Sequence, residues 1–159
     1  ALVDLADAHQ RFVGARALWD MDSVHELFLA QAEPGSIGLS AIGSQLRPTG
    51  PGEDVGIHIR LGPGGTTVRA PVAPGMIVPV AIKRWHLLMI GARVRIDLRP
   101  CTLALDGERT FSLHSGEVVC VEFTSCGPTV VEIAATLREA ALHGIFVETS
   151  AAADLDSPA

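Results

Sequence analysis

Apolar and polar residues alternate most strictly in the middle of the chain. In VGIHIRL, residues 55–61, apolar side chains occupy every second position, and His58 and Arg60 lie between them. A period of two is typical of a β-strand with one buried face. The alternation returns in ARVRIDL, residues 92–98, and a turn at HSGE leads into VVCVEFT, residues 118–124. Short strands separated by turn residues predict a mainly β fold, a sandwich-like meander.

Glycine and proline mark the turns between these strands. The GPGG stretch at residues 62–65 predicts a loose hairpin turn, because it lacks the Lys-Ser/Thr pair of a phosphate-binding loop. Residues 66–82 carry three prolines, which predicts edge strands or bulges, since proline cannot donate to a β-ladder. The Asp106-Gly107 pair predicts a two-residue hairpin turn between strands at residues 102–105 and 109–113, because glycine tolerates positive φ.

Two segments show helical spacing instead. In DMDSVHELFLAQAEPG, residues 20–35, a capping box of Ser23 and Glu26 frames apolar residues at helical spacing, which predicts a short N-terminal helix ending at Pro-Gly. A second capping box, Thr129 and Glu132, begins the clearest helical pattern of the chain, and Gly144 ends it. We expect the apolar stripe of this C-terminal helix to pack on the sheets.

The ends of the chain complete the predicted domain organisation. Residues 1–13 predict one long strand or a pair of strands. Residues 1–148 are expected to form one β domain, and residues 149–159 a flexible tail. The chain begins in an apolar, strand-like pattern without Met. We therefore expect it to be a fragment that a further segment precedes.

Composition and charge narrow the classes of function. The chain has 159 residues, 48% of them apolar, with a net charge of −6 and a single lysine. This charge offers no cationic surface for nucleic acid or anionic lipid, and the apolar runs are too short for a membrane span. The three cysteines lack paired metal-ligand spacing and suit a reducing compartment, so we expect a cytoplasmic protein.

Local motifs give no catalytic or metal-binding signature. The six histidines are scattered singly, without the spacing of a zinc site, so no metal site is predicted. His58 is expected to be an exposed strand histidine. The serine in GLSAIG, residues 38–43, lacks the context of a nucleophile elbow, so no hydrolase is predicted. We assign no catalytic residue to the chain.

Three polar features have two interpretations each. The Gly- and Ser-rich segment Gly35–Ser44 lets backbone amides and hydroxyls approach a ligand, but it equally suits a tightly packed junction. Asp4 lies in an otherwise apolar strand, where its carboxylate either faces solvent or is held for a hydroxyl partner. Asp106 either only shapes its turn, which we favour, or contacts a ligand.

Taken in order, several segments resemble the C-terminal half of the NAD kinase family, most closely its ATP-NAD kinase branch related to the acetoin-catabolism X protein. ALVD at residues 1–4 looks like the family's Ala-Leu-Asn-Glu/Asp strand, and GSIGLSAIG at 35–43 like a shortened Gly-Ser-Thr-Ala-Tyr segment. APVAPGMIVPVAI at 70–82 resembles its Pro-containing strand, and LALDGERTFSLHSGEVVCVEF at 103–123 its closing Asp-Gly hairpin. Val3 replaces the family's usual Asn, and the Thr-Ala-Tyr part is absent.

The resemblance implies a C-terminal β domain that supports an NAD site and subunit contacts. It further implies an N-terminal α/β domain of the same protein, which carries a Gly-Gly-Asp-Gly-Thr motif and handles ATP and Mg²⁺. This chain has no such motif. By position, the resemblance implies that Asp4 contacts the NAD ribose and that Ser36, Gly38 and Ser40 line the adenine and ribose. Asp106 falls on the family's Asp-Gly turn.

The leading hypothesis is an acceptor-binding and oligomerising domain of an ATP-dependent NAD kinase-like enzyme, which phosphorylates the ribose 2′-hydroxyl of NAD. The chain is expected to be inactive alone, since the phosphate-handling domain is absent from it. Two alternatives stay open. One is a non-catalytic all-β interaction or regulatory domain, and the other is a kinase-like protein acting on another hydroxylated metabolite, for which the missing Asn and Tyr leave room.

Overall fold

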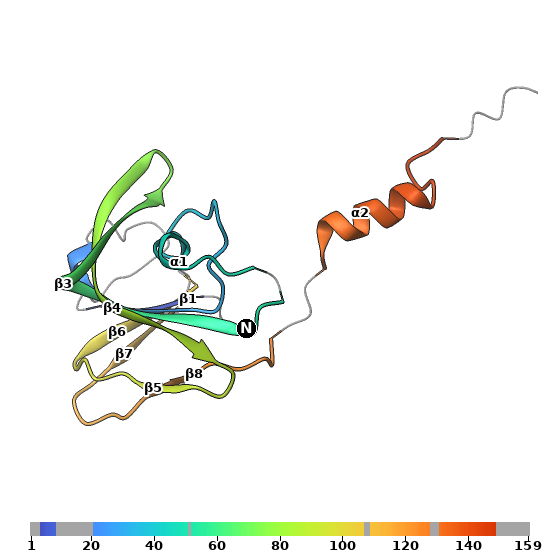
Figure 1. The fold of residues 1–159 in the computed structure, drawn as a ribbon. Coiled ribbons are helices and arrows are strands. Elements are labelled where there is room, and N and C mark those ends of the chain that lie inside the picture. Colours follow the sequence, from blue (N-terminus) through green and yellow to red (C-terminus); the bar gives the residue numbers. More distant parts are fainter. Residues whose placement is uncertain (1–3, 9–20, 51, 107–108, 128–130, 149–159) are drawn as a thin grey trace, which may run out of the picture. The chain divides into compact units, whose positions relative to one another are not determined.

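The computed structural model describes residues 4–8, 21–50, 52–106, 109–127 and 131–148 (Figure 1). The chain divides into two compact units, Ala1–Gly127 and Pro128–Ala159. The first unit holds the β-strands and one helix, and the second holds one helix. Each unit is described by itself.

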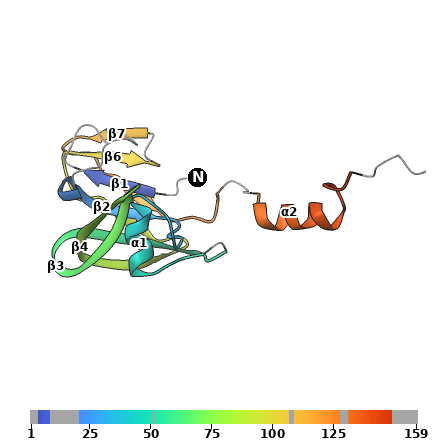
Figure 2. The same ribbon diagram turned by 90° about the horizontal axis from the view of Figure 1, so that it is seen from above.

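The first unit is built on a six-stranded antiparallel sheet with the strand order β4-β3-β2-β1-β6-β7 (Figures 1 and 2). Its strands are β1 (Asp4–Ala8), β2 (Val24–Leu29), β3 (Val55–Ala73), β4 (Met76–Met89), β6 (Cys101–Leu105) and β7 (Arg109–Leu113). The strands β5 (Arg93–Arg95) and β8 (Cys120–Glu122) pair in a separate two-stranded sheet. The predicted mainly β fold is confirmed.

Both faces of the large sheet carry buried apolar side chains. On one face the sheet packs against helix α1 (Ser40–Leu46), with a core that includes Ala6, Leu27, Ile57, Ile59 and Ile42. On the other face a second core includes Leu5, Phe28, Leu103, Ile96 and Leu113. Because both faces of the central strands are covered, polar side chains of these strands are buried whichever face they are on.

The predicted N-terminal helix at residues 20–35 is wrong. Residues Met21–Ser23 form a short 3₁₀ turn, and Val24–Leu29 form the strand β2 between β1 and β3. Five of the six β2 residues are buried, because this central strand is covered on both faces. Local spacing cannot report such burial, which comes from strand neighbours distant in sequence.

The short helix of the first unit lies instead in the Gly/Ser segment. Helix α1 packs closely on the sheet because residue 43 is glycine. A Cβ at Gly43 would overlap the Leu29 side chain and lie 3.3 Å from the Cβ of Ala32. The packing interpretation of this part of the segment is therefore supported.

The GPGG stretch at residues 62–65 does not turn the chain, contrary to the prediction. Leu61 and Thr66 both pair with Ile82, so the residues between them bulge out of β3 while the strand continues. The turn between β3 and β4 lies at Pro74-Gly75. Pro79 lies in β4, an edge strand, as the proline pattern predicts.

The hairpin around Asp106 is confirmed. Strands β6 and β7 pair antiparallel, and their last pair is Leu105 with Arg109. Three residues separate the members of this pair along the chain, so the predicted two-residue length of the turn is wrong. Asp106 has a φ of 51°, the left-handed conformation that aspartate tolerates in turns.

The second unit contains helix α2 (Ile133–Leu142), as its sequence pattern predicts. The side chain of Glu132 caps this helix by accepting a hydrogen bond from the amide of Ala135, whereas Thr129 lies outside the described residues. Gly144 follows with a φ of 68°. The apolar side chains of α2 are exposed within the chain, so its packing on a sheet stays a prediction.

No helix in the described part of the chain is long and apolar enough to cross a membrane.

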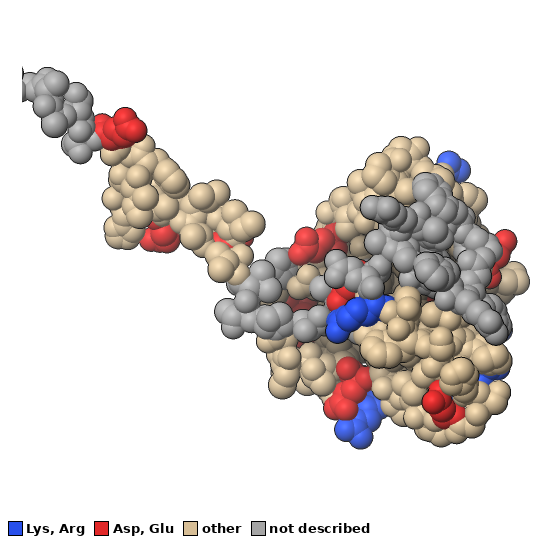
Figure 3. All heavy atoms as spheres, turned by 180° about the vertical axis from the view of Figure 1, so that it is seen from behind, with Lys and Arg blue, Asp and Glu red and all other residues tan. Residues whose placement is uncertain are grey.

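On the face of the first unit drawn in Figure 3, the coloured Lys and Arg side chains are scattered among Asp and Glu side chains.

Candidate functional site

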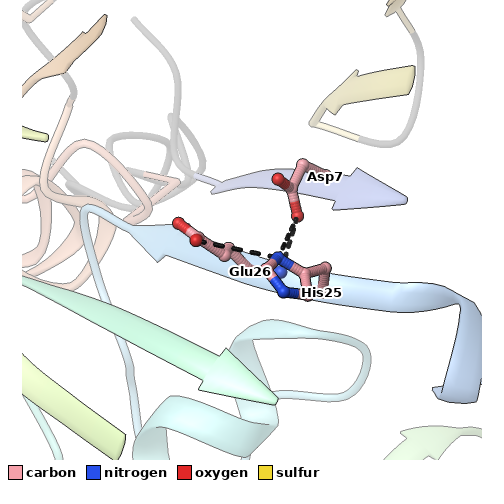
Figure 4. Close-up of side chains that lie close together, drawn as sticks. All are labelled: Asp7, His25 and Glu26. Atoms are coloured by element: carbon pink, nitrogen blue, oxygen red, sulfur yellow. Dashed lines mark hydrogen bonds and ion pairs between the residues drawn. The ribbon is translucent and has the colours of Figure 1, made fainter. Parts of the chain in front are cut away.

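A bulge in β2 creates the main polar feature of the first unit. Asp7 of β1 pairs with Glu26, but the next residue, Ala8, pairs with Val24, so His25 is an extra residue in β2. Bulges re-aim the side chains beside them. Here the side chains of His25 and Glu26 both lie close to Asp7 (Figure 4). The backbone amide of Glu26 donates to Asp7 Oδ1 at 2.7 Å.

Two carboxyl groups are enclosed at this bulge. The side chains of Asp7 and Glu26 are fully buried. Burial and the neighbouring charge of Glu26 raise the pKa of Asp7 to about 7, against the opposing effects of the Glu26 amide, Arg60 and Arg99. Asp7 Oδ2 has no hydrogen-bond partner among the described residues. Asp7 is thus a buried acid that exchanges its proton near neutral pH.

The second carboxyl group, Glu26, is paired with residues of β3. His58 Nε2 lies 2.8 Å from Glu26 Oε2, and Arg60 Nε lies 2.7 Å from Glu26 Oε1. The His58 ring stacks on Phe28 at a centroid distance of 4.4 Å. His58 is 2% exposed, so its prediction as an exposed strand histidine is wrong. The strand is covered on both faces, and the imidazole is held by a buried carboxylate.

The polar cluster reaches a fourth strand through His86 of β4. His58 Nδ1 lies 3.4 Å from His86 Nε2, and the two rings meet edge to face. Burial and the neighbouring His58 lower the pKa of His86. A chain of titratable groups therefore runs across four adjacent strands, β1, β2, β3 and β4.

A pocket of about 300 Å³ adjoins this cluster at His25. The pocket is lined by His25 together with residues of the 3₁₀ turn, the β3 bulge and β4, among them Met21, Gly62, Pro63 and Pro79. The His25 side chain is 40% exposed, whereas the two carboxyl groups behind it are buried. His25 thus separates solvent from the buried acids. Chemically, the group can exchange protons, bind a cation or contact a hydroxyl.

The structure brings some of the sequence-predicted site residues to one end of the sheet. Asp4 pairs with Leu29, the last residue of β2, and the connection that holds Ser36, Gly38 and Ser40 begins directly after it. On its other side β1 pairs with β6, where Leu5 lies opposite Leu105. Asp106, the residue after Leu105, therefore lies at the same end of the sheet as Asp4. The side chain of Asp4 lies outside the described part of the structure.

The rest of the predicted site is held by backbone contacts. Gly38 has a φ of 111°, and its amide donates to the carbonyl of Pro71 at 2.9 Å. Ser40 is the first residue of α1. Ser36 Oγ is buried without a hydrogen-bond partner among the described residues. Asp106 lies 3.8 Å from Arg109, an ion pair across its own hairpin loop.

Sequence reasoning missed the cluster of Asp7, His25 and Glu26. One candidate ligand atom from each of these residues lies within 4.8 Å of the other two. The expectation of no metal site rests on local spacing, whereas this cluster forms by pairing of two strands whose residues are far apart in sequence. The available signal was an acidic residue, Asp7, in a strand otherwise made of Leu and Ala, apart from Asp4.

Comparisons with known proteins assign the chain to a family. Residues 1–126 match the model of the acetoin catabolism protein X C-terminal domain. The chain is 36% identical over 149 residues to acetoin catabolism protein X of Cupriavidus necator, an alignment that covers 92% of this chain and 42% of that protein. The chain thus spans less than half the length of this relative. No solved structure matches the chain. The chain belongs to the acetoin catabolism protein X C-terminal domain family.

Proposed function

We propose that this chain is the acceptor-binding and oligomerising domain of an ATP-dependent NAD kinase-like enzyme. The observation that carries the proposal is that Asp4 and Asp106 lie at the same end of the sheet, where the connection leading to Gly35–Ser44 leaves β2. These are the segments on which the sequence resembles the NAD kinase family. The resemblance concerns only the order of these segments along the chain. The strand pairing adds that Asp4 and Asp106 are close in space.

The chemistry of this end suits a sugar acceptor. A carboxylate accepts hydrogen bonds from ribose hydroxyls, and charge-assisted hydrogen bonds are about twice as strong as neutral ones. Glycine and serine in the connection leave room for a ring to approach the backbone. Ser36 Oγ has no hydrogen-bond partner among the described residues, so a small shift of the connection would offer it to a ligand.

Phosphoryl transfer itself belongs to another part of the protein in this proposal. It needs a donor nucleotide, a metal ion that bridges the phosphates, and a residue that orients the attacking hydroxyl. We assign ATP, Mg²⁺ and that residue to an N-terminal α/β domain of the same protein. The present domain then contributes positioning of the acceptor, which accounts for a large part of the rate in such reactions.

The oligomerising role rests on β4, an edge strand of the large sheet. Four large apolar side chains of β4 are exposed, namely Ile77, Trp85, Leu87 and Met89. An unpaired strand edge with exposed apolar side chains is suited to pairing with another chain. A second copy of the same domain is the partner we assign to it.

A different acceptor is the second candidate, and one observation favours it. Val3 stands where the NAD kinase family has Asn, and the Thr-Ala-Tyr part is absent, so polar contacts to NAD are missing. The relative from Cupriavidus necator is named for acetoin catabolism, and acetoin is a small hydroxyketone. The same end of the sheet would then bind the hydroxyl of a smaller metabolite.

Titration calorimetry of the full protein with NAD and with acetoin tests both candidates. NAD binding with a Kd below about 1 mM is expected, weakened about tenfold in Asp4→Asn by loss of one charge-assisted hydrogen bond. Asp54→Asn, an exposed aspartate outside the strands, is the matched control. Formation of NADP from NAD, ATP and Mg²⁺ should fall in Asp4→Asn in parallel with binding.

Three results separate the hypotheses. Binding of acetoin but not NAD, with the same dependence on Asp4, favours the smaller acceptor. Binding of neither ligand refutes the acceptor role and leaves a non-catalytic interaction domain. Loss of thermal stability in Asp4→Asn, with unchanged NAD affinity, assigns Asp4 to the fold instead of the site.

A further inference from the structure

We infer that Asp7, His25 and Glu26 form a binding site for one divalent transition-metal ion, of the zinc or manganese class. The three residues come from the adjacent strands β1 and β2, and the bulge at His25 turns them toward one another (Figure 4). Strands hold side chains more precisely than loops do, which favours a defined coordination geometry. This inference concerns the middle of the sheet and is independent of the proposed acceptor site.

The distances are close to those of a metal site. His25 Nδ1 lies 3.8 Å from Asp7 Oδ1 and 3.7 Å from Glu26 Oε1. Tetrahedral ligands with bonds of about 2.0–2.2 Å are separated from one another by roughly 3.4 Å. Each His25 distance exceeds this value by a few tenths of an ångström, and all three ligand atoms lie within 4.8 Å of one another, so a bound ion would also draw the two carboxylates together.

An independent observation points to a missing ligand. Two fully buried oxygens of the cluster have no hydrogen-bond partner in the described part of the chain, Asp7 Oδ2 and Glu26 Oε1. Glu26 Oε1 is the oxygen that lies 3.7 Å from His25 Nδ1. Enclosing a carboxylate without a partner is costly, and proteins compensate by protonation or by a cation.

The partners of Glu26 are compatible with a ligating role. A carboxylate offers about four lone-pair sites, so Glu26 can keep His58 and Arg60 while it binds an ion. Ligating carboxylates in metal sites are themselves oriented by polar partners, here the contact with His58 and the ion pair with Arg60. His58 at 2.8 Å and Arg60 at 2.7 Å would fix the orientation of Glu26.

The donor set and the pocket define the class of ion. One imidazole suits zinc and other transition metals, whereas carboxylates also accept manganese and magnesium, so the mixed set favours zinc or manganese. The pocket of about 300 Å³ on the exposed side of His25 provides an entry path. It also leaves room for water or a small ligand at a further coordination position, as in open metal sites.

Metal titration of the protein, first stripped with EDTA, tests the site. We expect one Zn²⁺ or Mn²⁺ ion to bind at the site of Asp7, His25 and Glu26. Co²⁺ bound there should give a visible absorption band, which added Zn²⁺ should abolish by displacing the cobalt. Asp7→Asn and His25→Gln should each weaken this binding by about 10–100-fold, and zinc should raise the Tm of wild type but not of these two variants. His114→Gln, which changes an exposed histidine, should leave affinity and spectrum unchanged.

The outcomes either support or overturn the inference. Circular dichroism establishes that each variant folds, and His25→Gln is the safer variant because its side chain is half-exposed. If metal affinity and the cobalt spectrum are the same in wild type, Asp7→Asn and His25→Gln, the site does not exist. If wild type binds none of the three ions below about 1 mM, the inference fails as well. NAD titration in EDTA addresses the proposed function separately.

Discussion

Replacing Asp7 with Asn should stabilise this protein at neutral and alkaline pH. Asp7 is a fully buried acid with one hydrogen bond, from the backbone amide of Glu26 at 2.7 Å. Asparagine keeps the carbonyl that accepts this bond and has nearly the same shape as the carboxyl group, without its charge. The variant thus preserves the shape of the site and removes the ionisation of a buried group.

The magnitude follows from the pKa of Asp7, which burial raises from 3.8 to about 7. Below pH 3.8 the carboxyl group is protonated in both the folded and the unfolded state. Between pH 3.8 and about 7 the folded state retains a proton that the unfolded state has lost, so the free energy of unfolding falls as pH rises. At about 1.4 kcal/mol per pH unit, the total loss is on the order of 4 kcal/mol, of which roughly 3 kcal/mol lies above pH 5.

Urea unfolding between pH 5 and 8.5, in EDTA, measures this difference. His86 has a lowered pKa and contributes the opposite slope near its titration, but it is present in both proteins and cancels in the comparison. Asp7→Asn should gain stability over wild type as pH rises from 5 to 7, and then remain level. A difference that is constant across this range would refute the assigned burial of an uncompensated carboxylate.

Three further changes test the packing of the fold. Gly65→Ala should lower the free energy of unfolding by about 1–3 kcal/mol, because the new Cβ would meet backbone carbonyls of the neighbouring strand; Gly50→Ala, with no atom closer than 3.8 Å, is its control in urea unfolding. Glu26→Gln should cost about 3–5 kcal/mol because it removes the charge of a fully buried carboxylate that pairs with Arg60 and His58, whereas Glu53→Gln, in an exposed pair, should cost less than about 1 kcal/mol. Glu132→Ala should destabilise the last helix by about 1 kcal/mol through loss of its N-cap, seen as faster amide exchange in its first turn.

Short-range patterns predicted much of the fold correctly. The alternation at residues 55–61, the Asp106-Gly107 hairpin and the proline-bearing edge strand all report the backbone locally, and the structure has each of them. The C-terminal helix is likewise a local pattern with its own cap. Where each element lies relative to the others is a different matter, since no local signal specifies strand neighbours far apart in sequence.

The candidate site depends on such distant pairing. Asp7 and Glu26 meet because β1 pairs with β2, and His58 joins them because β3 lies on the other side of β2. Single histidines without a spacing motif were therefore no guide to this cluster. The GPGG stretch shows the same limit, because its bulge is maintained by a neighbouring strand and not by its own residues.

The wrongly predicted helix has a specific physical cause in the bulge of β2. Val24 and Leu27 belong to the core beneath α1, three positions apart, although a regular strand would place residues of opposite face at that spacing. Because His25 is an extra residue, Val24 lies on the same face of the sheet as Leu27. The resulting spacing of three residues resembles one turn of a helix. The same insertion brings His25 beside the buried acids. Removing the bulge would move Val24 out of its core or His25 away from Asp7. Both the apolar core and the polar cluster therefore depend on the extra residue at position 25. The departure from regular spacing in β2 was therefore the sequence signal of the site, and it could be read only once its strand partner was known.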